Sequence, residues 1–535
     1  MNIKKQIKNL IESFKLEEAY SLILEYEGNW EIDAEILTMK AIISVMKSEL
    51  GEAEGFLNEA LLIDQNYPDV HYNLAYIKQM RGELENAIAS YRQAYQLTNS
   101  EELKKIIEET IKSLKSDERH HPLVSIVLLA YNNINYTRMC VESIYKYTSH
   151  INFEFILVNN GSSDGTKEYF DSLPNARPIH LDQNVGPVNG FNEGMKVAKG
   201  KYIACVCNDF IFTPRWMDNL LKCIESDEKI GFVSPGASNI SNYQQIVGNY
   251  TTIEEMLNFA DEYNHTNPLK WEERVRLLPC VLLIRSSIFR EIGGYDPQFY
   301  FGEFADDDIA FRIRRAGYKL IFCKDTFTYH FGSITTREDQ VKNNSFAISR
   351  KIFMDKYGLD VWTEASFNAE FIENIKVSTK KVRQSILGIN TRCGADPLQL
   401  KNKLRNHGIF DVSITNYCID EKYFFDLTTV SHHVIVGSLN EIAGNLGHVR
   451  YDYIVCENNY SNLVNNPSFI SSVLEMLNYE GIAGFVVPVT EELIEISKEN
   501  IGRLFSENGF HITSIILGQE SKYVYKYLIT IQRGS

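Results

Sequence analysis

Alanines recur at a fixed interval of 34 residues in the first part of the chain. Three series share this interval: Ala19, Ala53 and Ala87; Ala41 and Ala75; Ala60 and Ala94. A repeat of this length is typical of stacked helix pairs, in which small side chains let two helices approach closely. Each pair buries its apolar face only against the next pair, so this stretch must fold as an array of its own. We therefore predict an all-α helical repeat solenoid over residues 1–116.

The last repeat unit has the most complete pattern. It runs from Tyr72 through Ala75, Ala87 and Tyr91 to Ala94, and it resembles the tetratricopeptide repeat. Solenoids of this kind present a concave surface to a peptide or a protein. The resemblance implies that residues 1–116 bind a protein acceptor or support a homo-oligomer. A plain helical bundle with coincidental alanines is the alternative.

The chain after residue 121 has the rhythm of α/β domains. A polar stretch that ends in Pro122 breaks the helical pattern, because proline disfavours helix in the residue before it. Apolar runs then alternate with helical patterns, as in a mostly parallel sheet. At 535 residues the chain is too long for one core. We predict an α/β domain over residues 122–350, a helical linker over 351–379 and a second α/β, Rossmann-like domain over 380–535.

Charge and cysteine content narrow the class of protein. The formal net charge of -16 is spread along the chain, so no basic face for nucleic acid is expected. Nine cysteines, an odd number, fit free thiols in a reducing compartment better than a disulfide framework. The first ten residues lack the apolar core of a secretory signal, and no apolar run reaches membrane-spanning length. We expect a cytoplasmic protein without a transmembrane segment.

Polar residues follow three of the apolar runs in residues 122–350. These strand exits are Tyr131-Asn132, the run from Asn159 to Gly165, and Asn208-Asp209. Ligands of α/β sheets bind beyond the carboxyl ends of parallel strands. A nucleotide base and ribose could lie against Asn159 and Asp164, and Asp209 could hold a divalent cation that neutralises a diphosphate. Taken singly, the run from Asn159 to Gly165 is also a good turn, and a simple turn is the favoured explanation of one isolated aspartate such as Asp209.

Three adjacent carboxylates, Asp306, Asp307 and Asp308, precede a helical pattern. Acidic residues at a helix start are stabilised by the backbone dipole, so an inert cap is one explanation. Adjacent like charges also raise one another's affinity for protons. This property suits a general base that takes a proton from an acceptor hydroxyl.

The order of these motifs resembles the family-two inverting glycosyltransferases with a GT-A fold. The matching motifs are 124–127, 160–166, 184–186, 190–194, 198–202, Asn208-Asp209, Arg285, 292–296, 306–317 and Tyr329-His330. The resemblance covers residues 124 to about 335. It implies a Rossmann-like GT-A domain that transfers a sugar from a nucleotide-sugar donor to an acceptor hydroxyl in a single displacement.

The resemblance also assigns roles to individual residues. It implies that Asp306 is the catalytic base and that Asp209, with His330, holds a divalent cation, Mn²⁺ or Mg²⁺. It implies a nucleotide site in which a UDP-sugar is the first choice of donor. Together with the strand exits, it places the nucleotide against Ala130, Tyr131, Asn132, Asn159, Asp164, Asn184, Gly186 and Asn208.

Three positions depart from the family pattern. Cys207 stands where the first acid of the metal motif usually lies, Asn159 replaces an aspartate that binds the nucleobase, and Ala305 replaces the acid before the base. Trp216 and Trp271 are candidates for sugar or acceptor recognition, with a place in the core as the alternative. The departures leave metal affinity as the weakest part of the assignment.

The last segment resembles a class I methyltransferase domain, most closely at residues 451–459 and 477–481. Its glycine-rich turn is degraded, however. Only Gly394 falls where a glycine is wanted, and the bulky Asn390 and Arg392 would crowd the approach of a cofactor. We therefore expect no methyltransferase activity and no binding of S-adenosylmethionine, although an active methyltransferase is the competing hypothesis.

The leading interpretation is a metal-dependent inverting glycosyltransferase whose repeats recruit a protein acceptor, such as flagellin or another surface protein. A protein acceptor is inferred from the solenoid, because the surface of a helical repeat is poorly suited to binding a small sugar. An envelope polysaccharide glycosyltransferase is the alternative enzyme, with repeats that serve assembly. A scaffold with two inactive enzyme folds is the alternative from another class.

Overall fold

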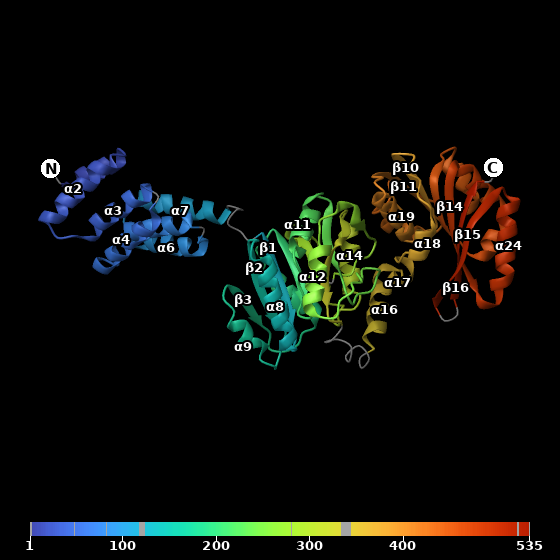
Figure 1. The fold of residues 1–535 in the computed structure, drawn as a ribbon, viewed down its shortest axis with the longest axis horizontal. Helices are drawn as coiled ribbons and strands as arrows, with labels where there is room; N and C mark the ends of the chain where they lie inside the picture. Colours follow the sequence, from blue (N-terminus) through green and yellow to red (C-terminus); the bar gives the residue numbers. More distant parts are fainter. Residues whose placement is uncertain are drawn as a thin grey trace. The chain divides into compact units, whose positions relative to one another are not determined.

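The computed structural model describes residues 3–47, 49–81, 83–116, 123–279, 281–332, 344–521 and 524–533 (Figure 1). The chain divides into two compact units, residues 1–121 and 122–535. The polar stretch predicted to separate them lies outside the described residues between 117 and 122. Each unit has hydrophobic clusters of its own, so each is described by itself.

The first unit is entirely helical over its described residues. Its helices are α1 (Ile3–Glu12), α2 (Leu16–Asn29), α3 (Ala34–Met46), α4 (Leu50–Ile63), α5 (Pro68–Met80), α6 (Leu84–Leu97) and α7 (Glu101–Ser116). Helices pack as consecutive pairs, α1 with α2, α3 with α4, and α5 with α6. Every alanine of the 34-residue series is fully buried. The small side chain is required there because a larger one would push the helices apart. The tetratricopeptide identity of these pairs stays a prediction.

The second unit begins with a mixed sheet whose strand order is β3-β2-β1-β4-β8-β6-β9-β5, with β7 also paired to β9. Strands β3, β2, β1 and β4 are parallel, and β8 runs antiparallel to β4 and β6. The strands are β1 (Val124–Ala130), β2 (Phe153–Asn159), β3 (Ala176–His180), β4 (Tyr202–Cys207), β5 (Phe210–Ile211), β6 (Ile230–Ala237), β7 (Trp271–Glu273), β8 (Val281–Arg285) and β9 (Lys319–His330).

Helices cover both faces of this sheet, which is why β1 is buried along its whole length. Alternate residues of β1 belong to two different hydrophobic clusters, one on each face of the sheet. Val127 lies in the first cluster and Ile126 in the second. The helices are α8 (Ile134–Thr148), α9 (Thr166–Asp171), α10 (Pro187–Lys196), α11 (Trp216–Glu225), α12 (Ile253–Tyr263), the 3₁₀ turn η2 (Pro268–Lys270), α13 (Ser286–Ile292) and α14 (Ala305–Arg315).

A second sheet follows, in the order β12-β11-β10-β13-β14-β16-β15, in which β16 is antiparallel to both β14 and β15 and the other pairs are parallel. Its strands are β10 (Arg383–Ile389), β11 (Asp411–Cys418), β12 (His433–Val436), β13 (Tyr451–Glu457), β14 (Leu477–Thr490), β15 (Phe510–Ser521) and β16 (Val524–Arg533). Its helices are α19 (Ala395–Asn406), η3 (Glu421–Tyr423), α20 (Phe424–Thr428), η4 (Leu439–Glu441), α21 (Ile442–Leu446), α22 (Tyr460–Asn465), α23 (Pro467–Met476), η5 (Glu491–Leu493) and α24 (Ile494–Glu507). The resemblance of this α/β region to methyltransferases stays a prediction.

The segment between the two sheets forms α16 (Ser345–Tyr357), α17 (Val361–Glu364) and α18 (Ala369–Asn374). Its side chains Phe353, Val361 and Phe371 are fully buried in one cluster that also contains residues of both sheets. The predicted helical linker is therefore part of a continuous core. Hydrophobic burial holds residues 122–535 together as one unit.

A buried ion cluster adds to this core. Asp426 on α20 is fully buried and pairs with Arg314 and Arg315, the last two residues of α14, at 3.1 and 2.8 Å. Arg314 is itself only 2% exposed. A buried carboxylate is tolerated where the opposite charge and its hydrogen bonds are supplied nearby, as they are here.

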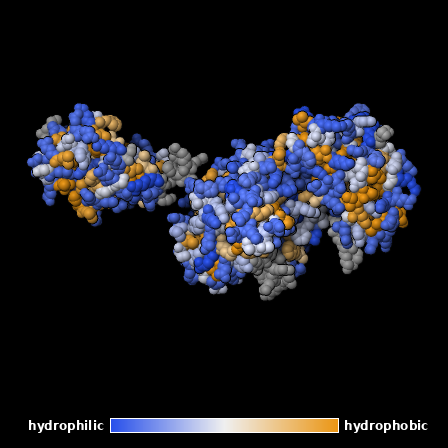
Figure 2. Space-filling model, in the orientation of Figure 1, coloured by the Kyte–Doolittle hydropathy of each residue, from blue (hydrophilic) through white to orange (hydrophobic). Residues whose placement is uncertain are grey.

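The surface in view is mostly hydrophilic, with hydrophobic residues in small groups (Figure 2). No helix within the described ranges is both long enough and apolar enough to cross a lipid bilayer.

Asp426→Ala is expected to destabilise residues 122–535 by about 3–5 kcal/mol, because it leaves the buried charge of Arg314 uncompensated and removes the partner of the partly exposed Arg315. Thermal unfolding of the whole chain would show a lower midpoint for the transition of this unit. Asp411→Ala is the matched control, since it removes a pair in which Arg383 is 83% and Asp411 is 53% exposed. Equal midpoints for the two variants would contradict the importance of the cluster.

Candidate active site

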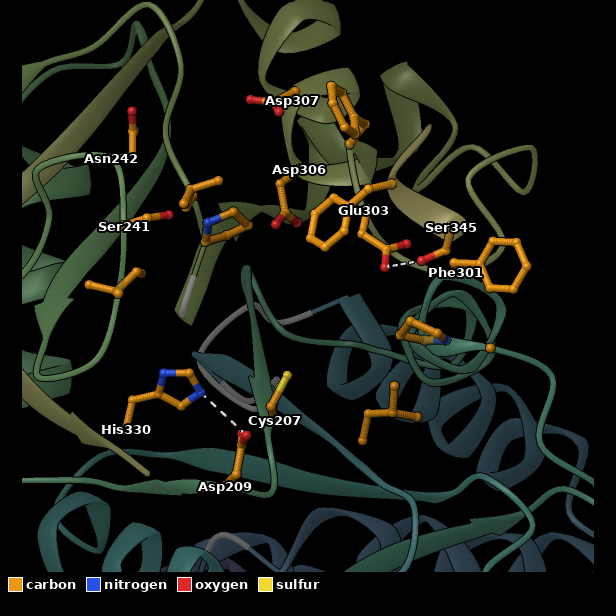
Figure 3. A pocket seen from close by; sticks show the side chains of 18 of the residues that line it. Cys207, Asp209, Ser241, Asn242, Phe301, Glu303, Asp306, Asp307, His330 and Ser345 are labelled. Atoms are coloured by element: carbon orange, nitrogen blue, oxygen red, sulfur yellow. Dashed lines mark hydrogen bonds and ion pairs between the residues drawn. The ribbon is translucent and has the colours of Figure 1, made fainter. Parts of the chain in front are cut away.

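A cavity of about 1030 Å³ lies beyond the carboxyl ends of β1 and β4. Seven of the predicted site residues line it: Tyr131, Asn184, Gly186, Asn208, Asp209, Asp306 and His330. Figure 3 shows Cys207, Asp209 and His330 on one side of this cavity and Glu303, Asp306 and Asp307 on the opposite side. The structure thus brings the predicted metal residues and the predicted base to one space.

The other four predicted residues do not line this cavity. Ala130 is fully buried at the end of β1 and is paired in register with Asn159 of β2. The side-chain oxygen of Asn159 accepts a hydrogen bond from the Ser162 amide at 2.9 Å, and that of Asn132 accepts one from the Ser163 amide at 2.9 Å. These side chains shape the loop after β2.

Asp164 also holds backbone. Its carboxylate accepts hydrogen bonds from the Ile134 amide at 2.8 Å and from the Thr166 hydroxyl at 2.6 Å, so it joins the starts of α8 and α9. Burial tends to raise its pKa, but the hydrogen bonds from Thr166 and Ile134 outweigh burial and lower it. Both oxygens of a stably charged carboxylate are engaged, which makes Asp164 an organiser of the loop in this structure.

The loop that carries Asn184 and Gly186 is fixed by amide side chains. Asn184 Oδ1 accepts hydrogen bonds from Asn160 Nδ2 and from the Gly186 amide, both at 2.9 Å. Gly186 has a φ of +81°, and a Cβ atom there would lie 2.4 Å from the carbonyl oxygen of Tyr300. Only glycine fits, because both the backbone angle and the close approach exclude a side chain.

The two polar residues that follow β4, Asn208 and Asp209, point in different directions. Asn208 points back into the fold, where its Nδ2 donates to the Asn132 carbonyl at 3.1 Å and to the Thr137 hydroxyl at 2.9 Å. Asp209 faces His330, with 3.3 Å between Oδ2 and Nε2. The pairing of β5 with β9 aligns Phe210 with His330, and their rings stack at 4.4 Å.

Proton positions at His330 bear on cation binding. Its Nδ1 lies 2.8 Å from the carbonyl oxygen of Asn239, which can only accept, so Nδ1 carries the proton. Nε2 then faces a carboxylate oxygen, and this contact needs either a second proton or a cation. Burial lowers the pKa of His330, but the hydrogen bond and charge of Asp209 outweigh burial and raise it.

The donor set of Asp209 and His330 fits a divalent cation that takes its other ligands from phosphate and water. Asp209 Oδ1 is buried without a hydrogen-bond partner among the described residues, as expected of an oxygen reserved for a ligand. No group of three or more His, Cys, Asp or Glu side chains within the described ranges makes a complete cation site. Burial, with Asp209 and Asp306 nearby, raises the pKa of the Cys207 thiol, so it stays neutral and is a weak ligand.

The three carboxylates at the start of α14 have different partners. Asp307 forms a two-bond ion pair with Arg276, at 2.7 and 3.1 Å. Asp308 is fully buried and binds Arg312 and Lys356 at 2.8 and 2.6 Å.

Asp306 forms no hydrogen bond or ion pair with the described part of the chain, and it lines the cavity. Burial, followed by the charge of Asp307, raises its pKa to about 7, against the lowering effect of Arg276. A carboxylate with these properties can accept a proton at neutral pH.

The sequence analysis missed several residues that line the cavity: Asn160, Arg276, Tyr300, Phe346 and Trp362. The two tryptophans named as candidates are instead in the core. Trp216 is fully buried and donates to the Thr148 hydroxyl at 3.0 Å, and Trp271 is 6% exposed and donates to Asp325 at 2.8 Å. Asn160 could have been found, because it belongs to the Asn-Asn-Gly strand exit.

The corresponding edge of the second sheet is filled by the chain itself. Asn390, Arg392 and Gly394 after β10 all have φ between +52° and +81°. This conformation costs a non-glycine residue roughly 1 kcal/mol. The Arg392 guanidinium donates to the Thr363 carbonyl on α17 and pairs with Glu457 at the end of β13. Glu364 of α17 accepts a hydrogen bond from Lys422 at 2.8 Å.

Comparisons with known proteins match two parts of the chain. The family described as "Glycosyl transferase family 2" matches residues 125–292, and that described as "Coatomer epsilon subunit" matches residues 6–125. "Glycosyltransferase GlyG" of Streptococcus pneumoniae is 30% identical over 216 residues, which are 38% of this chain and 68% of that protein.

Two further likenesses are more limited. An uncharacterized glycosyltransferase of Rickettsia bellii is 31% identical over 142 residues, 26% of this chain but only 19% of that relative. Among solved structures, "GalNAc-T7 with UDP, GalNAc and Mn2+" has a TM-score of 0.33 at 15% identity, over 44% of this chain and 53% of that one.

The motifs from the first strand to Ile292 thus coincide with a matched family region, and a relative is covered over two thirds of its length. The catalytic part of this chain is a glycosyltransferase domain of the GT-A type, and the protein belongs to glycosyl transferase family 2.

Proposed function

We propose that this protein is an inverting, metal-dependent glycosyltransferase that uses a nucleotide-sugar donor, with UDP-sugars the first to be tested. The observation that carries the proposal is the state of Asp306. It is the carboxylate of its cluster that has no ionic partner among the described residues, it faces the cavity, and its pKa lies near neutrality. Such a group supports direct proton abstraction from an acceptor.

The reaction is a single displacement. Asp306 takes the proton of the acceptor hydroxyl, the hydroxyl oxygen forms a bond to the anomeric carbon, and the bond from that carbon to the diphosphate breaks. Asn184 and Gly186 form the loop that faces the donor. A divalent cation, Mn²⁺ or Mg²⁺, held by Asp209 and His330 would neutralise the charge of the departing diphosphate.

Residues 1–116 are proposed to bind a protein acceptor, because stacked helix pairs present a surface suited to a polypeptide. The second sheet is proposed to be structural and not to bind S-adenosylmethionine. The contacts of Arg392 with Thr363 and Glu457 support this, since they occupy the edge where a cofactor would need open backbone.

Asp306→Asn is expected to lower sugar transfer by roughly 10²–10⁴-fold, because the amide cannot accept the proton. Release of nucleoside diphosphate from a panel of nucleotide sugars would be measured with Mn²⁺ and with chelator. Wild-type release should require the cation. Asp218→Asn, an acidic-to-amide change on α11 outside the cavity, serves as the control. Full activity of the Asp306 variant would rule out its role as the base.

The acid side of the pH profile should follow Asp306. Only the charged carboxylate accepts a proton, so kcat/KM should fall about tenfold per unit below a pH of about 7. Arg276→Gln removes a positive charge that lowers this pKa, so the fall should begin at a higher pH. Initial rates between about pH 5 and 9 at saturating Mn²⁺ test this. His330 is a second titratable group at the cavity, but a shift caused by Arg276 identifies Asp306.

A chain that begins at residue 122 tests the role of the repeats. Because residues 122–535 form a compact unit, this shorter chain should keep release of nucleoside diphosphate from the donor. It should lose modification of the protein acceptor. Mass spectrometry of candidate surface proteins incubated with both chains provides the measurement, and equal modification by the two chains would argue against recruitment by the repeats.

A further inference from the structure

One wall of the catalytic cavity is aromatic and comes from outside the region matched to the family. Its side chains are Tyr300, Phe301, Phe346 and Trp362. The family match ends at residue 292, so these four residues lie beyond the matched region. Phe346 and Trp362 come from α16 and α17, which pack into the core shared with the second sheet.

Phe346 is one of three exposed rings of this wall, together with Tyr300 and Trp362. Phe304 stacks on Trp362 at 4.8 Å, and the Arg350 guanidinium lies 5.5 Å from the same indole ring. Trp362 is thus held in place and supports Phe346, whose ring lies 5.8 Å away and is 41% exposed. An aromatic ring held at the edge of a cavity provides an apolar surface for a ligand.

A carboxylate stands beside the aromatic wall. Glu303 Oε1 accepts a hydrogen bond from the Ser345 hydroxyl at 2.6 Å (Figure 3). Its Oε2 is buried and has no hydrogen-bond partner among the described residues. Glu303 is also close enough to Asp306 to raise the pKa of that residue. A buried oxygen that lacks a partner is satisfied when a ligand brings a donor such as a hydroxyl group.

The acidic charge on this side of the cavity further limits the kind of ligand that can bind there. Glu303, Asp306 and Asp307 are acidic, and the guanidinium of Arg276 is already paired with Asp307. A phosphate or another anion would be repelled here. A neutral molecule with an apolar face and several hydroxyl groups fits the wall, and a pyranose ring is such a molecule.

We propose that Tyr300, Phe346, Trp362 and Glu303 form an acceptor subsite for a sugar residue, so that this protein extends a saccharide already attached to its acceptor. The inference rests on the proposed function. A C–H face of the pyranose packs on Phe346, one hydroxyl donates to Glu303, and a second hydroxyl reaches Asp306. An earlier transferase must then attach the first sugar to the molecule that the repeats bind.

The test compares acceptors and variants of the full chain. Methyl pyranosides of common hexoses and N-acetylhexosamines, and a serine- and threonine-rich peptide, are offered with the donor that the protein uses. At least one glycoside should accelerate release of nucleoside diphosphate and yield a disaccharide by mass spectrometry. Phe346→Leu should raise the KM for that glycoside about tenfold, with the KM for the donor unchanged, because bulk remains but the aromatic face is lost.

Two further variants and a binding measurement complete the test. Phe346→Tyr should retain the KM of the wild type, and Phe410→Leu, at a position 62% exposed outside the cavity, is the matched control. Saturation-transfer NMR should detect the methyl glycoside on the wild type and lose the signal with Phe346→Leu.

The outcomes separate the subsite from the reaction. Diphosphate release that the peptide accelerates and no glycoside does would overturn the subsite alone, as would an unchanged glycoside KM in Phe346→Leu. If no nucleotide sugar in the panel releases diphosphate, the proposed function fails and the subsite fails with it.

Discussion

The position of the proposed base depends on an ion cluster at the far end of its helix. Helix α14 carries Asp306 in its first turn and Arg314 and Arg315 in its last, and both arginines pair with the buried Asp426. A helix of this length is a stiff rod of roughly 16 Å. A carboxylate of the second α/β region therefore holds the last turn of the helix whose first turn carries the proposed base. This ionic connection adds to the hydrophobic cluster that spans both sheets.

Helix α14 also shows how one of three adjacent aspartates acquires a raised pKa. Asp307 and Asp308 have cationic partners, which keep their charges compensated inside the protein. Asp306 has none among the described residues, and its pKa rises to about 7. Burial is the main cause of the raised pKa of Asp306, and the lack of a pairing cation among the described residues distinguishes Asp306 from its two neighbours. Composition of the motif alone does not distinguish them.

The sequence predicts the parts of the site that depend on strand order. Tyr131, Asn184 and Asp209 follow parallel strands or their loops, and such residues converge at one sheet edge. It does not predict which polar side chain turns inward. Asn208 and Asp164 have the residue types of ligand contacts, yet they hydrogen-bond to nearby loops. Trp362 was beyond prediction because it lies in a segment read as a linker, and packing from distant residues brings it to the cavity.

Helix α17 has contacts on two sides. Trp362 lines the catalytic cavity, while Thr363 and Glu364 bind Arg392 and Lys422 at the edge of the second sheet. Contacts that fix the loop after β10 therefore also fix the turn of helix that carries Trp362. A substitution of Arg392 or Lys422, far along the chain from the family-matched region, would loosen a wall of the catalytic cavity without touching any of its lining residues.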